Sequence, residues 1–278
     1  MAEVRTSQHA GTGNNPWQVP EYRVDWEATK RTKYAVAVFV INEGERIRRQ
    51  LAQMKAYVGQ ADIVVADGGS TDGSLVPDQM ADANVSALLV KTGPGKLSAQ
   101  MRMAFAYAMQ KGYEGVITID GNGKDGLDAI PRFVQLLEEG WDHIQGSRFV
   151  PGGHHANTPW SRFLALKLIH APLISCAAGI HYTDTTNGFR AYSRRFLLDP
   201  RVQPFRDVFV GYELHYYLAI RAGKLGFRVC ETPVSRVYPA NGPTPTKIRP
   251  LRGNWLVLKT LLRSLTRAYD PKPARQSS

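Results

Sequence analysis

Residues 61–74 read ADIVVADGGSTDGS, a mostly apolar run that ends at Asp67 and passes at once into glycine, serine and threonine. A short apolar run bounded by such a loop is typical of a buried strand. The same order, an apolar run followed by polar or glycine residues, recurs at 34–43 and at 115–125. Buried strands that end in polar loops predict a parallel sheet whose loops meet at one edge, where ligands bind.

Segments with helical periodicity separate these strands. Apolar residues recur at helical spacing in 45–58 and again in 95–112. Strands that alternate with helices predict an α/β fold, here a doubly wound and mostly parallel sheet. The other predicted strands span 85–90, 142–148 and 227–234, and the other predicted helices span 159–180 and 212–222.

The composition is that of a globular protein. Of the 278 residues, 43% are hydrophobic and 21% are charged, which excludes a mostly disordered chain. Two cysteines, Cys176 and Cys230, are too few for a disulfide framework, so we expect a reducing, cytoplasmic location. The formal net charge of +11 favours an anionic partner, such as a phosphorylated substrate or an acidic membrane.

The excess of positive charge is concentrated near the C-terminus. From Arg236 onward the chain has nine lysine and arginine residues and one acid, Asp270. Residues 252–267 have helical periodicity with an apolar stripe and a basic stripe. Such a helix can lie on an anionic bilayer, or it can pack on the domain with a solvated basic face. The residues of the apolar stripe are Trp255, Leu258, Leu262 and Leu265.

The sequence divides into three parts. Residues 1–33 are polar and contain several glycine, asparagine and proline residues, so we expect an extension with little structure of its own. Residues 34–235 form the predicted α/β domain, and 236–278 form the basic C-terminal segment. No uncharged apolar run of about 18 residues occurs, so we predict no transmembrane helix. The polar start is also unlike a secretory signal.

Three loops carry side chains that suit a bound nucleotide or phosphate. Asp67 could accept a hydrogen bond from a base or a ribose, or its loop could simply form a turn that leads to a helix. Lys96 follows GPG and begins a helix, where a cation suits a phosphate, although an ordinary exposed lysine would look the same. Asp120, Asn122 and Asp125 could supply oxygen ligands to a divalent cation, or they could form a simple turn.

Taken in order, seven segments resemble family 2 glycosyltransferases of the GT-A fold. Within that family they are most similar to the dolichol-phosphate mannosyltransferase-like branch, whose members transfer sugars to polyprenyl phosphates. The resemblance runs from about residue 34 to about residue 268. The segments are INEGERI (41–47), DGGSTDGS (67–74), GPGKLSAQ (93–100), ITIDGNGKDGLDAIP (117–131), QGSRFVPGG (145–153), DTTNGFRAYSR (184–194) and the GYEL…GFRVCETPV pattern (211–234).

The resemblance implies that a nucleotide-sugar donor lies across the strand ends and that the sugar is transferred with inversion. It implies catalytic roles for Arg148 and for Asp120, the first carboxylate of the DxD motif. The family often has proline, tyrosine and a second acid where this chain has Phe39, Ile41 and Gly68. Nucleotide contacts are implied for Phe39, Ile41, Asn42, Glu43, Asp67, Gly68 and Lys96. Phosphate or acceptor contacts are implied for Arg162, Arg190, Lys247 and Arg249.

A divalent metal, Mg²⁺ or Mn²⁺, is the cofactor that the resemblance implies. Its candidate ligands are Asp120, Asn122 and Asp125. The second acid of the motif is replaced by Asn122, a neutral oxygen ligand, which lowers the expected affinity for metal. Asp125 could compensate for that loss, so the sequence leaves metal dependence open.

A polyprenyl-phosphate lipid is the expected acceptor, because the basic tail would bring the chain to an anionic membrane or to a membrane partner protein. A phosphate is already anionic and needs no general base, whereas a sugar hydroxyl needs one. For a soluble or glycan hydroxyl acceptor, the candidate base is Glu213. We therefore predict a cytoplasmic enzyme that is peripheral on the membrane face.

Two other interpretations belong to different classes of protein. The neutral Asn122 would also suit a GT-A-like domain that binds nucleotide without turnover. A nucleic-acid-binding module is not expected, because beyond its charge the sequence has no helix with base-reading side chains and no aromatic stacking motif.

Overall fold

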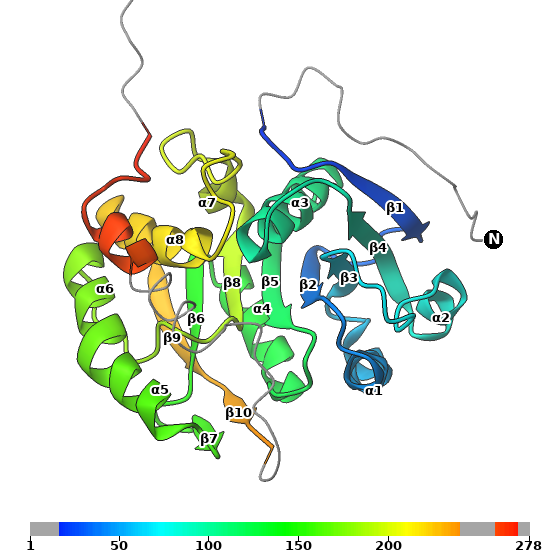
Figure 1. Ribbon diagram of the computed structural model, residues 1–278, viewed down its shortest axis with the longest axis horizontal. Coiled ribbons are helices and arrows are strands. Elements are labelled where there is room, and N and C mark those ends of the chain that lie inside the picture. Colours follow the sequence, from blue (N-terminus) through cyan, green and yellow to red (C-terminus); the bar gives the residue numbers. More distant parts are fainter. Residues whose placement is uncertain (1–16, 240–258, 272–278) are drawn as a thin grey trace, which may run out of the picture.

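The computed structural model describes residues 17–239 and 259–271. Within these residues, an eight-stranded sheet has the order β1-β4-β3-β2-β5-β8-β6-β9 (Figure 1). Neighbouring strands are parallel except where β1 or β8 takes part, which confirms the predicted mostly parallel sheet. The strands are β1 (Tyr22–Glu27), β2 (Tyr34–Val40), β3 (Asp62–Asp67), β4 (Val85–Lys91), β5 (Gly115–Asp120), β6 (His143–Ser147), β8 (Arg190–Ser193) and β9 (Val229–Pro233).

The ends of three parallel strands meet in the middle of the sheet. β2 lies between β3 and β5 and runs parallel to both. Val40 pairs with Asp67, and Phe39 pairs with Asp120. The two acids that the sequence singled out therefore flank the end of β2, as expected for the carboxyl edge of a parallel sheet.

Helices cover both faces of the sheet, so the doubly wound fold is also confirmed. Because side chains alternate across a strand, the fully buried β2 supplies both layers. Ala37 and Phe39 pack with residues of α3 and α8, while Val36 and Val38 pack with residues of α1 and α4. The helices are α1 (Glu45–Met54), η1 (Lys55–Tyr57), α2 (Pro77–Asp82), α3 (Leu97–Gln110), η2 (Leu127–Ala129), α4 (Ile130–Glu138), α5 (Trp160–Ala165), η3 (Leu166–His170), α6 (Ala171–Ala178), α7 (Arg194–Leu198) and α8 (Glu213–Lys224).

The predicted extension contains a strand of the main sheet. β1 pairs antiparallel with β4 at the edge of the sheet, and Tyr22 and Trp26 are buried. The Trp26 indole N–H donates to the Val85 carbonyl at 2.8 Å. The expectation of little structure in residues 1–33 is therefore wrong for β1, whose few apolar residues alternate with charged ones. The three-part division of the chain stays a prediction.

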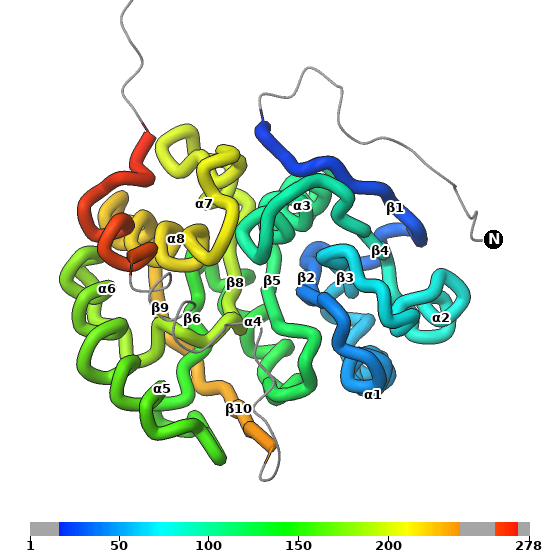
Figure 2. The backbone as a smooth tube through the Cα atoms, in the orientation of Figure 1, coloured from blue at the N-terminus to red at the C-terminus, as the bar shows by residue number. Residues whose placement is uncertain are grey.

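α5, the π-helical turn η3 and α6 form one continuous helix, Trp160–Ala178 (Figure 2). The helix has 19 residues, and an 18-residue stretch of it has a mean hydropathy of 1.2, so by length and composition it could cross a membrane. The sequence predicted no such helix, because Arg162 and Lys167 interrupt the apolar run. Only 22% of the helix is buried inside the molecule, and Trp160 and Leu168 are each 70% exposed.

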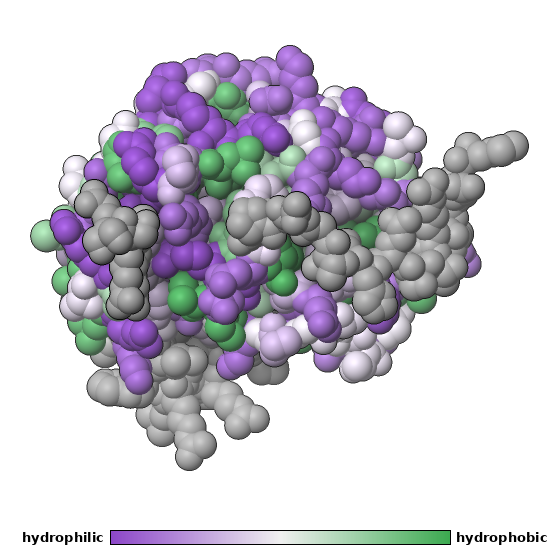
Figure 3. Space-filling model, turned by 90° about the horizontal axis from the view of Figure 1, so that it is seen from above, coloured by the Kyte–Doolittle hydropathy of each residue, from purple (hydrophilic) through white to green (hydrophobic). Residues whose placement is uncertain are grey.

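The basic C-terminal segment is helical over 259–265, beside α6 and α8 (Figure 1). Leu261 is fully buried and Leu262 is 48% exposed, so of the two described residues of the predicted apolar stripe only Leu265 packs on the domain. The helix is instead turned so that Leu261 and Leu265 pack on the domain. Seen from above, the molecule is mainly hydrophilic with small apolar groups (Figure 3). Four residues of the earlier predictions, Lys247, Arg249, Trp255 and Leu258, lie outside the described residues.

Candidate active site

A cleft of about 800 Å³ opens at the carboxyl ends of β2, β3 and β5, where the sequence predicted a ligand site. α5, the start of α8 and a short strand, β10 (Ser235–Val237), complete its walls. Eight of its described lining residues are lysine or arginine, and two, Glu43 and Asp120, are acidic. Both acids already form ion pairs, Glu43 with Arg46 and Asp120 with Arg236. The cleft is therefore strongly cationic, which suits phosphate groups.

The structure brings most of the predicted site residues to this cleft. The predicted residues that line it are Phe39, Ile41, Glu43, Gly68, Lys96, Asp120, Asn122, Arg148, Arg162 and Arg190. Those that are described but are not part of its lining are Asn42, Asp67, Asp125 and Glu213. The chemical roles assigned to these residues stay predictions.

The loops after β2 and β3 are held by hydrogen bonds of their own. The Ser70 backbone N–H donates to both oxygens of Asp67, at 3.0 and 2.9 Å, and the Ser70 hydroxyl donates at 2.6 Å. Asn42 has a positive φ of 48° and accepts from the Thr71 N–H at 2.8 Å. The Asp67 carboxylate therefore stabilises its own turn. The sequence left this role open as the alternative to a contact with a base or ribose.

Gln100, on α3, ties the ends of two strands together and was not found by sequence reasoning. Its amide donates to the carbonyls of Val40 at 2.9 Å and Ala66 at 3.1 Å. A Cβ at Gly68 would lie 2.9 Å from Gln100 Nε2 and 3.3 Å from the Val40 oxygen. In this structure there is therefore little room for a side chain at position 68.

Two lysines line the cleft near the start of α3. The Lys96 backbone N–H donates to the Val210 carbonyl at 2.8 Å, directly before the helix begins. Lys91, at the end of β4, is buried, and its Nζ donates to the Gly93 carbonyl at 2.7 Å. Burial lowers the pKa of Lys91, against the opposing effect of the Asp67 charge. Two cations beside a helix N-terminus favour an anion at this place.

The loop after β5 is joined to β10 by a buried arginine. Arg236 Nη1 donates to both oxygens of Asp125, at 2.7 and 2.6 Å, and Nη2 donates to Asp120 at 2.9 Å. The Arg236 side chain is 8% exposed. Burial raises the pKa of Asp120, but the Arg236 guanidinium outweighs burial and leaves this pKa below its usual value. Asp120 is therefore held in its charged form.

These residues fit a divalent cation poorly. Asp120 and Asp125 already accept from a guanidinium, and the Asn122 amide donates to Asp120 at 3.3 Å. Asn122 Oδ1 accepts from the Lys124 backbone N–H at 3.3 Å. Within the described ranges, no group of three or more His, Cys, Asp or Glu side chains could hold a metal. Asp120 and Asp125 are close in space, but the cation that they bind is the Arg236 guanidinium.

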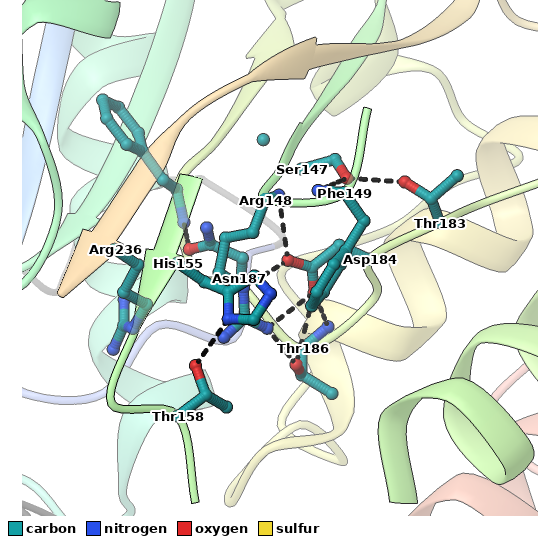
Figure 4. A network of polar contacts seen from close by, with 12 residues as sticks. Ser147, Arg148, Phe149, His155, Thr158, Thr183, Asp184, Thr186, Asn187 and Arg236 are labelled. Atoms are coloured by element: carbon teal, nitrogen blue, oxygen red, sulfur yellow. Dashed lines mark hydrogen bonds and ion pairs between the residues drawn. The ribbon is translucent and has the colours of Figure 1, made fainter. Parts of the chain in front are cut away.

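Arg148, which follows β6, is held by a buried carboxylate. Its Nε and Nη2 donate to the two oxygens of Asp184 at 2.6 and 3.0 Å, and Nη2 also donates to the Thr186 hydroxyl at 3.0 Å (Figure 4). Burial raises the pKa of Asp184, but the hydrogen bond from Arg148 brings it below its usual value. Arg148 thereby orders the loop 184–188, part of which lines the cleft.

Two further arginines bring charge to the cleft without an acidic partner among the described residues, Arg162 on α5 and Arg190 on β8. The Arg190 guanidinium donates to the backbone carbonyls of Asn187, His215 and Thr185, at 2.9, 2.8 and 2.8 Å. Burial, and then the charge of Arg190, lowers the pKa of His215 to about 3, so this imidazole is neutral at pH 7. Arg190 is 2% exposed, so its charge lies buried in the wall of the cleft.

Glu213, the candidate base, is engaged at the start of α8. Its carboxylate accepts from the Gly211 backbone N–H at 2.5 Å. An acid in the first turn of a helix is also favoured by the helix dipole. These contacts are those of a residue that stabilises a helix start.

Arg236, Lys124 and Tyr238 line the cleft, and sequence reasoning missed their place in it. Arg236 was counted only as part of the basic tail, and it follows Asp125 by 111 residues. No local pattern marks a pairing over that distance. Correlated substitutions at the two positions among relatives are the signal that would have found it.

Comparison with curated proteins points to one class of enzyme. No family model matches the chain. The chain is 29% identical over 236 residues to the polyprenol monophosphomannose synthase of Mycolicibacterium smegmatis, and the match covers 84% of each chain. It is 26% identical over 198 residues to the undecaprenyl-phosphate mannosyltransferase of Micrococcus luteus, covering 70% of this chain and 80% of the relative.

A solved structure shows the same fold. Glucosyl-3-phosphoglycerate synthase from Mycobacterium tuberculosis matches with a TM-score of 0.60 at 17% identity, covering 87% of this chain and 81% of that one. The chain is a GT-A glycosyltransferase. The matched crystal structure contains Mn²⁺, uridine diphosphate and glucosyl-3-phosphoglycerate, so a divalent metal accompanies the nucleotide in that neighbour. The resemblance, fold and enzyme class predicted for this glycosyltransferase are confirmed.

Proposed function

We propose that this glycosyltransferase moves a sugar from a UDP- or GDP-sugar to the phosphate of a polyprenyl lipid at a membrane surface. The observation that carries the proposal is the charge of the cleft, where eight described cations face two acids that are both ion-paired. A donor diphosphate and an acceptor phosphate bring the negative charge that such a cleft stabilises. The named curated relatives act on polyprenol or undecaprenyl phosphate, which supports this class of acceptor.

The proposed donor site is the side of the cleft built by β2, β3 and the start of α3. Ile41, Glu43 and Gly68 come from the strand ends, and Lys96 precedes the helix N-terminus. Glycine lets the backbone approach a bound nucleotide closely, and the helix N-terminus favours phosphate. The acceptor phosphate would then enter from the side of α5, where Arg162 lies.

The proposed reaction follows from this arrangement of donor and acceptor in the cleft. An oxygen of the acceptor phosphate attacks the anomeric carbon of the sugar, and the bond from that carbon to the donor diphosphate breaks, with inversion. The electron pair of the broken bond stays on the leaving diphosphate. Arg190 and Arg236 line the same cleft and would stabilise this developing charge, which is the main contribution such a site makes. No proton has to be removed from the acceptor, since a phosphate is already anionic.

A hydroxyl acceptor, the alternative, has less support. Such an acceptor needs a general base, and the two acids of the described lining are bound to Arg46 and Arg236. Glu213 accepts from Gly211, and the neutral His215 has a pKa of about 3, which makes it a weak base. The structure therefore supports a phosphate acceptor better than a hydroxyl.

Mg²⁺ or Mn²⁺ is the cofactor that the sequence predicted for the leaving diphosphate. The neighbour that contains Mn²⁺ with uridine diphosphate supports a divalent metal in this fold. In this chain the predicted ligands Asp120 and Asp125 bind Arg236 instead, so no step is assigned to a metal here.

The helix Trp160–Ala178 is the surface that we propose for membrane contact. One side of it lines the cleft through Arg162 and Leu166, while Trp160 and Leu168 are largely exposed. A helix with an exposed tryptophan and leucine and with charges among its residues is suited to the membrane interface rather than to its core. Such contact would bring the acceptor side of the cleft to the lipid headgroups.

The basic C-terminal helix would add electrostatic attraction. Its apolar side packs on the domain through Leu261, while Lys259 and Arg263 are exposed. Exposed lysine and arginine near an anionic bilayer each contribute about 1 kcal/mol of attraction. We propose that the enzyme is peripheral on the cytoplasmic membrane face, alone or with a membrane partner protein.

A transfer assay tests the function. The protein is incubated with labelled UDP-sugars or GDP-sugars and vesicles that contain a polyprenyl phosphate, and the product is extracted into organic solvent. Label in the organic phase supports the proposal. Label transferred only to a water-soluble hydroxyl or phosphorylated acceptor contradicts the lipid acceptor, and nucleotide binding without any transfer supports a domain without turnover.

A charge-matched pair of variants makes the assay specific. Arg162→Gln should lower transfer at least about tenfold, a loss of about 1.4 kcal/mol of transition-state stabilisation, while nucleotide binding stays unchanged. Arg49→Gln removes an arginine that is 77% exposed on α1 and should leave transfer unchanged. Equal effects of the two variants would contradict an acceptor site at α5.

A further inference from the structure

The two carboxylates of the loop after β5 converge on one guanidinium. Arg236 Nη1 spans both oxygens of Asp125, and Nη2 reaches Asp120 at 2.9 Å. The side chains of Arg236 and Asp125 are 8% and 1% exposed, so this contact is shielded from solvent. A protein cation thus lies between the two acids that the sequence assigned to a metal.

Backbone pairing fixes the position of this arginine. The Val237 N–H donates to the Lys124 carbonyl at 2.9 Å, and the Gly126 N–H donates to the Ser235 carbonyl at 3.0 Å. These two bonds lie on either side of Arg236 in the chain. The guanidinium therefore enters the site from a fixed backbone position, as a preorganised charge should.

The surroundings are positive as well. Lys124 lines the same cleft, and its Nζ lies 5.1 Å from the centre of the Tyr238 ring. Burial raises the pKa of the Tyr238 phenol, but the charges of Arg236, Arg148 and Lys124 bring it below its usual value. Arg236 and Lys124 together balance the charges of Asp120 and Asp125, so the loop has no net negative charge left to attract a divalent cation.

The neutral residue of the motif agrees with this arrangement. The Asn122 amide donates a hydrogen bond to Asp120 at 3.3 Å, which an ionised acid at position 122 could not do. With Arg236 in place, Asp120 and Asp125 already have a positive partner. A second acid at position 122 would leave an unpaired negative charge facing the donor diphosphate.

We propose that the Arg236 guanidinium, together with Lys124, takes the place of the divalent cation, so that this enzyme binds the donor diphosphate without metal. The inference rests on the proposed function, because it needs a nucleoside diphosphate in this cleft. A guanidinium is planar and has five N–H donors, so it can bind carboxylates on one side and phosphate oxygens on another. During transfer it stabilises the electron pair that the anomeric carbon leaves on the diphosphate.

The unmodified protein supplies the first test. Calorimetric titrations with UDP and with GDP are run after treatment with EDTA and again with excess Mn²⁺ or Mg²⁺. The nucleotide that binds should do so in EDTA, and metal should change its Kd by less than about threefold. Binding that requires metal, or that metal strengthens more than about tenfold, contradicts the inference. No binding of either nucleotide in either condition contradicts the proposed donor site, and the inference with it.

A spectroscopic measurement gives a second readout. The electron paramagnetic resonance signal of free Mn²⁺ should keep its intensity when the protein is added without nucleotide. A decrease that matches one Mn²⁺ bound per chain would overturn the inference, whatever the transfer activity is.

Substitutions at the two key positions should reverse the preference. Arg236→Gln should weaken nucleotide binding in EDTA at least about tenfold, while Arg49→Gln, matched in charge but exposed on α1, should leave it unchanged. The double variant Arg236→Gln with Asn122→Asp restores two acids without the guanidinium and should bind nucleotide only with Mn²⁺. Unchanged EDTA binding by Arg236→Gln contradicts the inference. If that variant fails to fold, the titrations of the unmodified protein decide.

Discussion

The two sides of the cleft are built by different kinds of contact. On the side of β2 and β3, hydrogen bonds hold the loops, some within one loop, as between Asp67 and Ser70, and some between segments, as from Gln100 to Val40. On the side of α5 and β10, ion pairs join distant segments: Arg148 and Asp184 are 36 residues apart, and Arg236 follows Asp125 by 111. The turn at Asp67 on the first side follows from a local sequence pattern, whereas the contacts of Gln100 and the ion pairs of the second side form only when the chain has folded.

Breaking a distant ion pair should have the largest effect on stability. Asp184→Asn leaves the buried Arg148 guanidinium without its charged partner and should lower the free energy of unfolding by about 3–5 kcal/mol. Urea unfolding measures the loss. Asp199→Asn, which removes the partner of the exposed Arg201, is the matched control and should lose only a small part of that amount. Equal losses would show that the buried, long-range pair contributes no more to the free energy of unfolding than the exposed pair does.

Acid should weaken the same side of the molecule. Burial lowers the pKa of His143 well below its usual value and, together with the charge of Arg190, lowers that of His215 to about 3. Both stay neutral in the folded chain, whereas the unfolded chain binds protons near pH 6.5. The contribution of these two groups to stability is therefore present above that pH and is lost as the pH falls below it, by about 2 kcal/mol for His215 between pH 7 and pH 5.

Unfolding measured across this pH range tests the expectation. His143→Gln should reduce the slope of stability against pH, and His154→Gln, at an exposed position, should not. A slope that is the same in all three proteins would mean that other groups cause the acid sensitivity.

The side of β2 and β3 should respond to the addition of a single methyl group, because Gly68 and Gln100 approach each other closely there. Gly68→Ala places a Cβ 2.9 Å from Gln100 Nε2 and should cost about 1–3 kcal/mol through overpacking. Gly59→Ala is the control, because a Cβ there meets nothing within 4 Å. Thermal unfolding of both variants distinguishes them, and a Gly68→Ala protein as stable as the control would show that the strand ends tolerate rearrangement.

Substitutions on the outer face of α5–α6 should have the smallest effect on stability and the largest effect on membrane binding. The double variant Trp160→Ser with Leu168→Ser removes two largely exposed apolar side chains and should change stability by no more than about 0.5 kcal/mol. Flotation with anionic vesicles should fall at least about tenfold, since burying each side chain in lipid is worth about 2 kcal/mol. Unchanged flotation would move the membrane contact elsewhere on the molecule.

Sequence patterns predicted the strands and helices well where one short segment contains the whole signal. The run YAVAVFV became the fully buried β2, and the helical spacing of 95–112 became α3. They predicted β1 and the C-terminal helix poorly. β1 is defined by its pairing with β4, and the choice between Leu261 and Leu262 depends on the surface that the helix packs against.

The same division holds for the candidate site. Glycine and acidic residues at strand ends marked Gly68 and Asp120, and a cation at a helix start marked Lys96; all three line the cleft. Glu213 was chosen by resemblance, but its carboxylate serves the start of its own helix. Gln100 was missed because its amide bonds to backbone carbonyls, which leave no trace in the sequence.

The sequence by itself determined the parallel sheet and its polar edge, because apolar periodicity and loop composition are properties of short segments. The class of enzyme came from the resemblance of seven segments to a known family. Only the tertiary structure decided which charges meet. Arg236 lies far from Asp120 along the chain, and the two come together because β10 pairs with the loop after β5. Charge interactions depend on distance in space and on burial, and a linear sequence contains neither until the chain has folded.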